Sequence, residues 1–163
     1  SFINRKDMSE IINQISEKRK EEILSIVYSL GGFIIFPSNK IMINGKKRLT
    51  INGERGWNKR IVDRFDLTLE CIRRYYLNIE SPLKKTLERY KDFFTLFGHF
   101  EGYTNFFLLN DLVKDDLSIN FFIPFDGFEN SPLPSNIEEY LIYKENVEDF
   151  INKRNDRITN EYK

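Results

Sequence analysis

The chain of 163 residues has few of the residues that mark several large classes of protein. Its single cysteine, Cys71, excludes an internal disulfide and with it the bridged framework of a small secreted domain. Its single histidine, His99, excludes the histidine-rich clusters that bind metals. No apolar run approaches the length of a membrane span, and no signal-peptide pattern opens the chain. We therefore predict a cytoplasmic protein with no membrane partner, no metal and no cofactor.

The chain also lacks an excess of charge of either sign, because 25 basic residues balance 25 acidic residues. General nucleic-acid binders usually carry a basic excess, so nucleic acid is an unfavoured partner. Nucleic-acid binding would require the basic residues to gather on one face of the protein, and the candidates for that face are Lys46, Lys47, Arg48, Arg55 and Lys59. The glycines of residues 52–56 match neither the P-loop nor the dinucleotide fingerprint, and the lysine and hydroxyl partners of a P-loop are missing.

Aromatic side chains are abundant, with 15 phenylalanines and eight tyrosines. They predict a core filled by rings. The length is that of one domain, 1–163, and no repeat or flexible linker divides it. Ser1 stands where a methionine would begin a complete chain, so residues upstream of this domain are an open expectation.

The pattern of apolar residues predicts an α+β fold that is mostly α, with a helical core around one central helix and a small antiparallel sheet or hairpin. Helices are expected, apart from the central one, over about 7–30 in two pieces, 81–97, 102–113 and from Ser135 to about 159. Short apolar runs predict strands at 33–36, 41–43, 49–51 and 117–125. The dipeptide Asn44-Gly45 is typical of a hairpin turn between two of them.

The central helix is expected over Arg55 to Tyr76 and carries apolar residues on two opposite sides. At about 100° per residue, one side gathers Ile61, Val62, Phe65, Leu69, Ile72, Tyr75 and Tyr76. Leu67 and Cys71 lie roughly opposite. We therefore expect neighbouring elements to enclose this helix on two sides.

Charged residues run between these two apolar sides, and they have two interpretations. As a site, Asp66 and Glu70 would be catalytic, with either one acting as general base. A small phosphate- or carboxylate-bearing ligand would then bind to Asn52, Arg55, Arg60, Arg64 and Arg73. As a structural feature, the same residues would form an ion-pair network between helices. We take the network as the more common case. A shifted pKa would not by itself indicate a site, because structural ion pairs shift pKa values as active sites do.

Most of the chain resembles an uncharacterised bacterial family of domains of unknown function, of the DUF6994 type. The resemblance spans about residues 23–158 and rests on GGFIIFP, INGERGWNKRIVDRFDLTLECIRRYY, SPLKKTLERYKDFFTLFGHFEGYTNFFLLNDLV and RNDRI. The segment DRFDLTLECIRR is the most specific part. The resemblance implies a bacterial protein and brings no activity with it.

Two functions from different classes therefore stay open. A ligand-binding protein or enzyme would bring at least three of the charged side chains together in one concave site. A protein–protein interaction or regulatory module would instead expose an apolar surface patch. The sequence leaves the reaction, the substrate, the oligomeric state and any partner protein undetermined.

Overall fold

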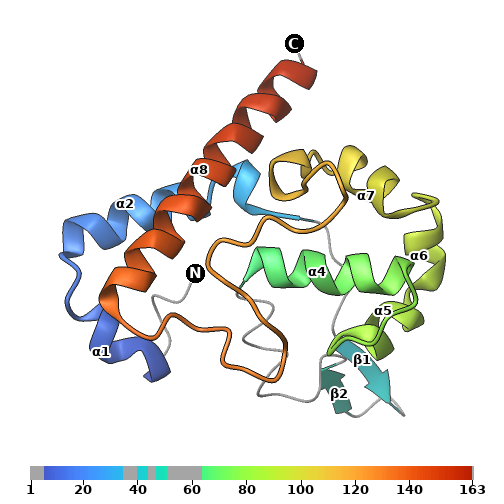
Figure 1. The fold of residues 1–163 in the computed structure, drawn as a ribbon, viewed down its shortest axis with the longest axis horizontal. Helices are drawn as coiled ribbons and strands as arrows, with labels where there is room; N and C mark the ends of the chain where they lie inside the picture. The colour runs from blue at the N-terminus through green and yellow to red at the C-terminus, as the bar shows by residue number, and fades with distance from the viewer. Residues whose placement is uncertain (1–5, 35–39, 44–46, 51–63, 163) are drawn as a thin grey trace.

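The computed structural model describes residues 6–34, 40–43, 47–50 and 64–162 (Figure 1). In these residues the α-helices are α1 (Ser9–Ile12), α2 (Glu17–Val27), α4 (Phe65–Tyr76), α5 (Lys84–Arg89), α6 (Lys91–Thr95), α7 (Phe100–Phe106) and α8 (Ile137–Glu161). Short 3₁₀ helices are η1 (Lys6–Met8), η2 (Leu30–Gly32) and η3 (Asn110–Leu112). Two strands, β1 (Lys40–Ile43) and β2 (Lys47–Thr50), pair antiparallel with Lys40 opposite Thr50.

Helix α4 lies in the middle of the molecule and is enclosed on two sides, as the sequence predicts (Figure 1). Leu69 and Ile72 on one side are each 1% exposed, and Leu67 and Cys71 on the other are fully buried. A helix with apolar residues on two opposite sides has to lie inside the fold to bury both sides.

The predicted start of this helix is wrong. Arg64 has an extended backbone, with φ −111° and ψ 110°, so α4 begins at Phe65. Residues 55–63 of the expected helix lie outside the described residues. The apolar periodicity continues through Arg64, but periodicity alone does not report where a helix begins.

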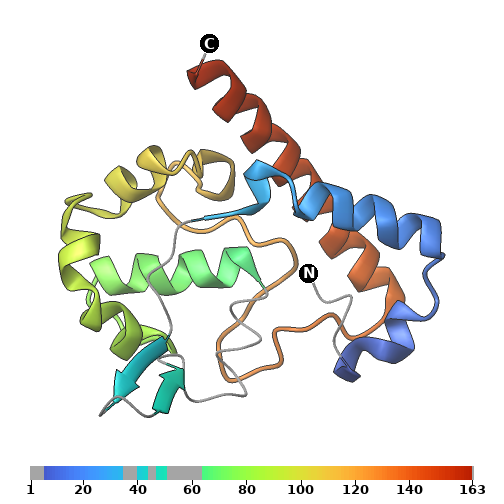
Figure 2. The same ribbon diagram turned by 180° about the vertical axis from the view of Figure 1, so that it is seen from behind.

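Helices α5, α6 and α7 curve around the C-terminal half of α4 (Figures 1 and 2). The rings of Tyr76, Phe94 and Tyr103 pack together there, and the Tyr76 hydroxyl donates a 2.7 Å hydrogen bond to the Phe94 carbonyl. Gly98, with φ +71°, turns the chain between α6 and α7. His99 then caps α7, because its Nδ1 accepts the Gly102 N–H at 3.1 Å.

Helix α8 is 25 residues long and packs against α2 and η2, and its C-terminal end projects beyond the body of the molecule (Figures 1 and 2). Its N-terminus is capped by Asn136, whose side chain accepts the Glu139 N–H at 2.9 Å. Buried Arg154 donates to the carbonyls of Phe107, Gly31 and Phe33 at 3.0, 2.7 and 2.6 Å. This single guanidinium ties α8 to two segments distant in sequence.

The predicted α+β class is wrong, because helices and the loops between them form the core of the described residues. Within those residues β structure is limited to the β1–β2 ribbon and one isolated bridge, Val113 to Ile119, so no sheet forms a layer of the fold. Phe33 and Ile34, expected to begin a strand, are irregular. The expected strand at 117–125 is a loop, although it contributes buried Phe122 and Ile123 to the core.

Candidate functional site

The first cluster of the predicted site is a buried ion pair between Arg64 and Asp66. The Arg64 side chain is 1% exposed and Asp66 is fully buried. The guanidinium binds both oxygens of the carboxylate, with its Nε 3.1 Å from Oδ1 and its Nη2 on Oδ2. Its Nη1 also donates to the Pro132 carbonyl at 3.0 Å, and Asp66 Oδ2 accepts the Phe122 N–H at 3.0 Å. Backbone groups of Pro132 and Phe122 therefore add one hydrogen bond to each member of the pair.

The second cluster lies one turn further along α4 and is centred on Glu70, which is 3% exposed. Its carboxylate accepts from Arg73 at 2.8 and 3.2 Å and from Arg74 at 2.7 Å. Arg74 continues outward to the Glu80 carbonyl at 3.3 Å and lies over the Phe128 ring at 4.8 Å. The two arginines offset the cost of the like charges at Asp66 and Glu70.

The structure thus places the residues of the predicted site in two separate groups. Arg64 and Asp66 form one, and Glu70 and Arg73 belong to the other. Within the described residues, no hydrogen bond or ion pair joins the two groups. Asn52, Arg55 and Arg60 lie outside the described residues. This geometry favours the structural interpretation of the α4 charges, and the catalytic assignment of Asp66 and Glu70 stays a prediction.

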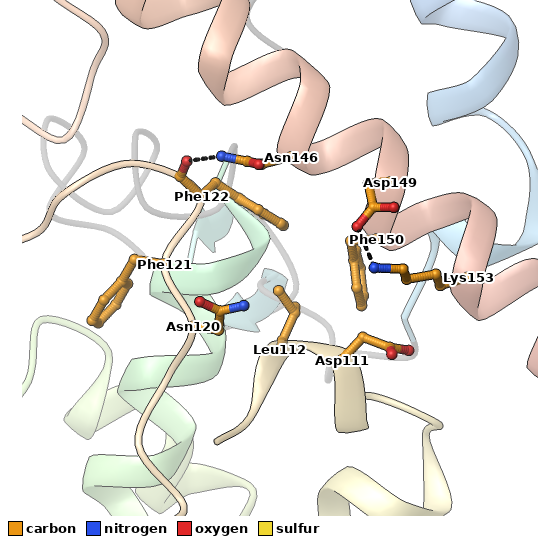
Figure 3. A pocket seen from close by; sticks show the side chains of 9 residues that line it. All are labelled: Asp111, Leu112, Asn120, Phe121, Phe122, Asn146, Asp149, Phe150 and Lys153. Carbon is orange, nitrogen blue, oxygen red and sulfur yellow. Dashed lines mark hydrogen bonds and ion pairs between the residues drawn. The ribbon is translucent and has the colours of Figure 1, made fainter. Parts of the chain in front are cut away.

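A polar pocket lies a short distance away, between α8, η3 and residues 120–122 (Figure 3). Its volume is about 170 Å³, smaller than the roughly 300–1,000 Å³ of sites for drug-sized molecules. The lining residues are Asp111, Leu112, Asn120, Phe121, Phe122, Asn146, Asp149, Phe150 and Lys153. A site of this size and polarity suits a small metabolite or one group of a larger ligand.

Two ion pairs border the pocket along α8. Lys153 Nζ lies 2.7 Å from Asp149 Oδ2, and Arg157 contacts both oxygens of Asp111 at 2.7 and 2.9 Å. The Arg157 hydrogen bonds hold the pKa of Asp111 below its usual value, and the hydrogen bond to Asp149 raises the pKa of Lys153. Asp111, Lys153 and Arg157 are therefore charged at neutral pH.

Two carboxamides add hydrogen-bonding groups to the same pocket. Asn146 uses one N–H to hold the Phe122 carbonyl at 2.7 Å, as Figure 3 shows, so its Oδ1 and second N–H remain for a ligand. The side chain of Asn120 makes no hydrogen bond to another residue in the described ranges, and its backbone N–H is fixed on the Leu112 carbonyl at 2.8 Å. The pocket thus combines donors, acceptors and charges of both signs.

The peptide of Phe122 connects the buried Asp66 to the pocket. Its N–H is held by Asp66 from α4 at 3.0 Å, and its carbonyl is held by Asn146 from α8 at 2.7 Å. In a strand, a neighbouring strand would satisfy these backbone groups. Here side chains of two helices do so, which explains why this apolar segment is a loop and how the pocket wall is fixed.

None of the site residues selected from the sequence lines this pocket. Its polar side chains are those of Asp111, Asn120, Asn146, Asp149 and Lys153. The signal for three of them is present in α8, because residues at i, i+3 and i+7 lie on one face of a helix. Nothing in the sequence indicates that residue 120 lies against that face.

No group of three or more histidine, cysteine, aspartate or glutamate side chains in the described ranges is arranged to hold a metal ion. A helix of sufficient length and apolarity to cross a membrane is likewise missing from the part of the chain that the structure describes.

The fold and the site define a helical domain with a small polar pocket beside its C-terminal helix. The chain belongs to a family of unknown function, DUF6994, whose model matches residues 1–158. The match confirms the resemblance carried by the central segments of the sequence. Neither the curated proteins nor the solved structures contain a match to this chain.

Proposed function

We propose that the protein binds a small anionic ligand, one bearing a phosphate or carboxylate, in the pocket between α8 and residues 120–122. The observation that supports this most directly is the set of side chains on the pocket. Lys153 supplies a cation, and the amides of Asn120 and Asn146 supply neutral donors. A cation with nearby amide donors is suited to an oxyanion.

The same set favours a ligand that also carries hydroxyl groups. An ionised carboxylate accepts hydrogen bonds and donates none. Asp111 and Asp149 would therefore bind the hydroxyl groups of the ligand rather than the anionic group of the ligand. Small hydroxy acids and sugar phosphates combine these two features. The α4 residues enter this proposal indirectly, because Asp66 holds the Phe122 peptide that forms part of the wall. A cytoplasmic location in a bacterium stays a prediction from the sequence.

Isothermal titration with a panel of small hydroxy acids and sugar phosphates tests this proposal. Lys153→Met should raise the Kd of any ligand found by about tenfold or more, since it removes a charge-assisted contact. Lys84→Met is the matched control, because it breaks a similar Lys84–Glu80 pair at 2.5 Å away from the pocket. Equal affinity in wild type and Lys153→Met, or no binding across the panel, would refute the proposal.

A second candidate function, a protein interaction module that associates with another copy of itself, is favoured by three exposed apolar side chains around η2. Tyr28, Leu30 and Phe33 are 65%, 66% and 54% exposed, and the rings of Tyr28 and Phe33 lie 6.3 Å apart. Clustered exposed apolar residues are typical of interaction surfaces. Sedimentation velocity of wild type and Leu30→Asp tests it: a concentration-dependent dimer lost in the variant supports this function, and a monomer in both excludes self-association.

A further inference from the structure

Two buried polar side chains on α8 stand apart from the pocket and from every ion pair described above. Lys144 and Tyr140 are both fully buried. Lys144 Nζ and the Tyr140 hydroxyl have no hydrogen-bond partner in the part of the chain that the structure describes. They are four residues apart, so they lie one above the other on the same face of the helix.

Both groups are hydrogen-bond donors that lack an acceptor. A lysine ammonium has three N–H donors and no acceptor site, and the Tyr140 hydroxyl adds one O–H donor. In the described residues the ammonium has two aromatic contacts, since Nζ lies 5.8 Å from the Tyr140 ring centre and 5.6 Å from that of Tyr143, and the charge of Glu148 acts on it without a hydrogen bond. Buried donors without partners are rare in native proteins, and each one calls for a physical explanation.

We propose that Lys144 and Tyr140 form an internal binding site for a small oxyanion, such as a carboxylate or a phosphate. An oxyanion supplies what both groups lack, namely negative charge and several acceptor lone pairs. A metal cation or an amine fits poorly, because it would face the positive charge of the ammonium with the Tyr140 phenol oxygen as its one acceptor from the pair. The site is independent of the surface pocket, whose lining does not include either residue.

Helix α2 lies next to the part of α8 that carries this site, because Arg19 of α2 contacts Glu148, four residues beyond Lys144. It packs along α8 (Figures 1 and 2) and is fastened there by Arg19, whose Nη2 contacts both oxygens of Glu148 at 2.9 and 2.8 Å. Ile23 is the one fully buried residue of α2, and Ile26 and Val27 are partly buried against the core, so a small apolar surface holds the helix in place. Segments with few buried apolar contacts open at low free energy. Opening of α2 provides the route to Lys144 without unfolding the core around α4.

Arg19 would assist the anion once it has entered. Its charge and that of Glu148 both act on Lys144 and on Tyr140, which places the four groups in one electrostatic neighbourhood. The Arg19 side chain is 36% exposed, so it can exchange part of its contact with Glu148 for the incoming anion. The site would then contain two cations and one phenol around the bound anion, with the Glu148 carboxylate still in contact with Arg19.

Binding of inorganic phosphate and of acetate, measured by thermal unfolding and isothermal titration at constant ionic strength, tests the inference. Wild type should show saturable binding with a rise in Tm. Lys144→Met should weaken binding at least tenfold. Tyr140→Phe, which removes one hydroxyl and keeps the ring, should weaken it about three- to tenfold.

Lys153→Met separates this site from the surface pocket. If phosphate binds between α2 and α8, this variant retains the wild-type affinity while Lys144→Met loses it. If Lys153→Met loses the affinity and Lys144→Met keeps it, phosphate occupies the pocket instead, and the internal site is refuted. Absence of saturable binding of either anion to wild type also overturns the inference. Circular dichroism of each variant confirms that the fold is retained.

Discussion

Replacement of Lys144 by methionine should stabilise the protein, although it removes a fully buried side chain of the core. Methionine has a similar length and volume and carries no charge, so it can occupy the same space beside Tyr140 and Tyr143. A buried charge without a paired counter-ion is among the costliest groups in a fold. The substitution therefore removes a penalty and creates no large cavity.

The size of the effect follows from the ionisation of the amine. Burial lowers the pKa of Lys144 from 10.5 to about 8. At about 1.4 kcal/mol for each pH unit, the folded state loses about 3–4 kcal/mol by holding this group charged at pH 7. The two aromatic contacts of the ammonium return about 1–2 kcal/mol. Lys144→Met should therefore raise the free energy of unfolding by about 1–3 kcal/mol at pH 7.

The same shift fixes the dependence on pH. Below pH 8 the amine is charged in both states, and the folded state bears the full penalty. Between about pH 8 and 10.5 the folded amine is neutral while the unfolded one still holds its proton, so the stability of wild type rises with pH. The advantage of Lys144→Met over wild type should consequently shrink across this interval.

Urea denaturation of wild type and Lys144→Met at pH 7 and at pH 10, in a buffer free of phosphate and carboxylate, measures both effects. Lys91→Met, at an exposed lysine, is the control for loss of a surface charge. A variant less stable than wild type at pH 7 would refute the reasoning. So would an equal difference at the two pH values, since the penalty would then not depend on the proton.

Three other changes test the remaining parts of the structure. Asp66→Asn leaves the Arg64 guanidinium buried without its counter-ion and should cost about 3–5 kcal/mol in urea denaturation; a cost below about 1 kcal/mol would contradict a structural role for this pair. Gly31→Ala would place Cβ 2.5 Å from a backbone oxygen of α8, whereas Gly98→Ala meets open space and bears only the strain of its φ of +71°, about 1–2 kcal/mol. Calorimetry should therefore show the larger fall in Tm for Gly31→Ala, and the reverse order would contradict the close approach. Burial raises the pKa of Cys71 to about 12, so a thiol reagent at pH 8 should react with it only after unfolding, and rapid labelling of the native protein would refute its burial.

Much of α4 could be predicted from local spacing. The periodicity of Leu69 and Ile72, with Leu67 and Cys71 opposite, indicates a helix covered on two sides, and the structure confirms it. The start at Phe65 could not be predicted, because the extended backbone of Arg64 depends on its contacts with residues 123 and 132, about 60 positions away in the chain.

The predicted strand at 117–125 shows why the fold class was missed. A short apolar run is compatible with a buried strand, and nothing local separates it from a buried loop. The decision depends on what binds its backbone. Asp66 takes the N–H of Phe122 and Asn146 takes its carbonyl, so no partner strand is required.

The candidate site could likewise be predicted only in part. The sequence identified the charged residues of α4 as brought together, and it described an ion-pair network as the common outcome. Which arginine pairs with which carboxylate depended on burial, since Arg64 reaches Asp66 only because its backbone leaves the helix. The pocket required three segments to meet, and those segments are separated in the chain by other elements.

By itself the sequence determined the helices with strong apolar periodicity and the family, because these properties depend on neighbouring residues and on composition. The single domain stays a prediction. The tertiary structure decided the core of helices and connecting loops, the partners of each charge, the pocket and the burial of Lys144 and Tyr140. Contacts between distant segments control all of these, and the free energy of a charged side chain changes by several kcal/mol according to whether such a contact buries it or leaves it in water.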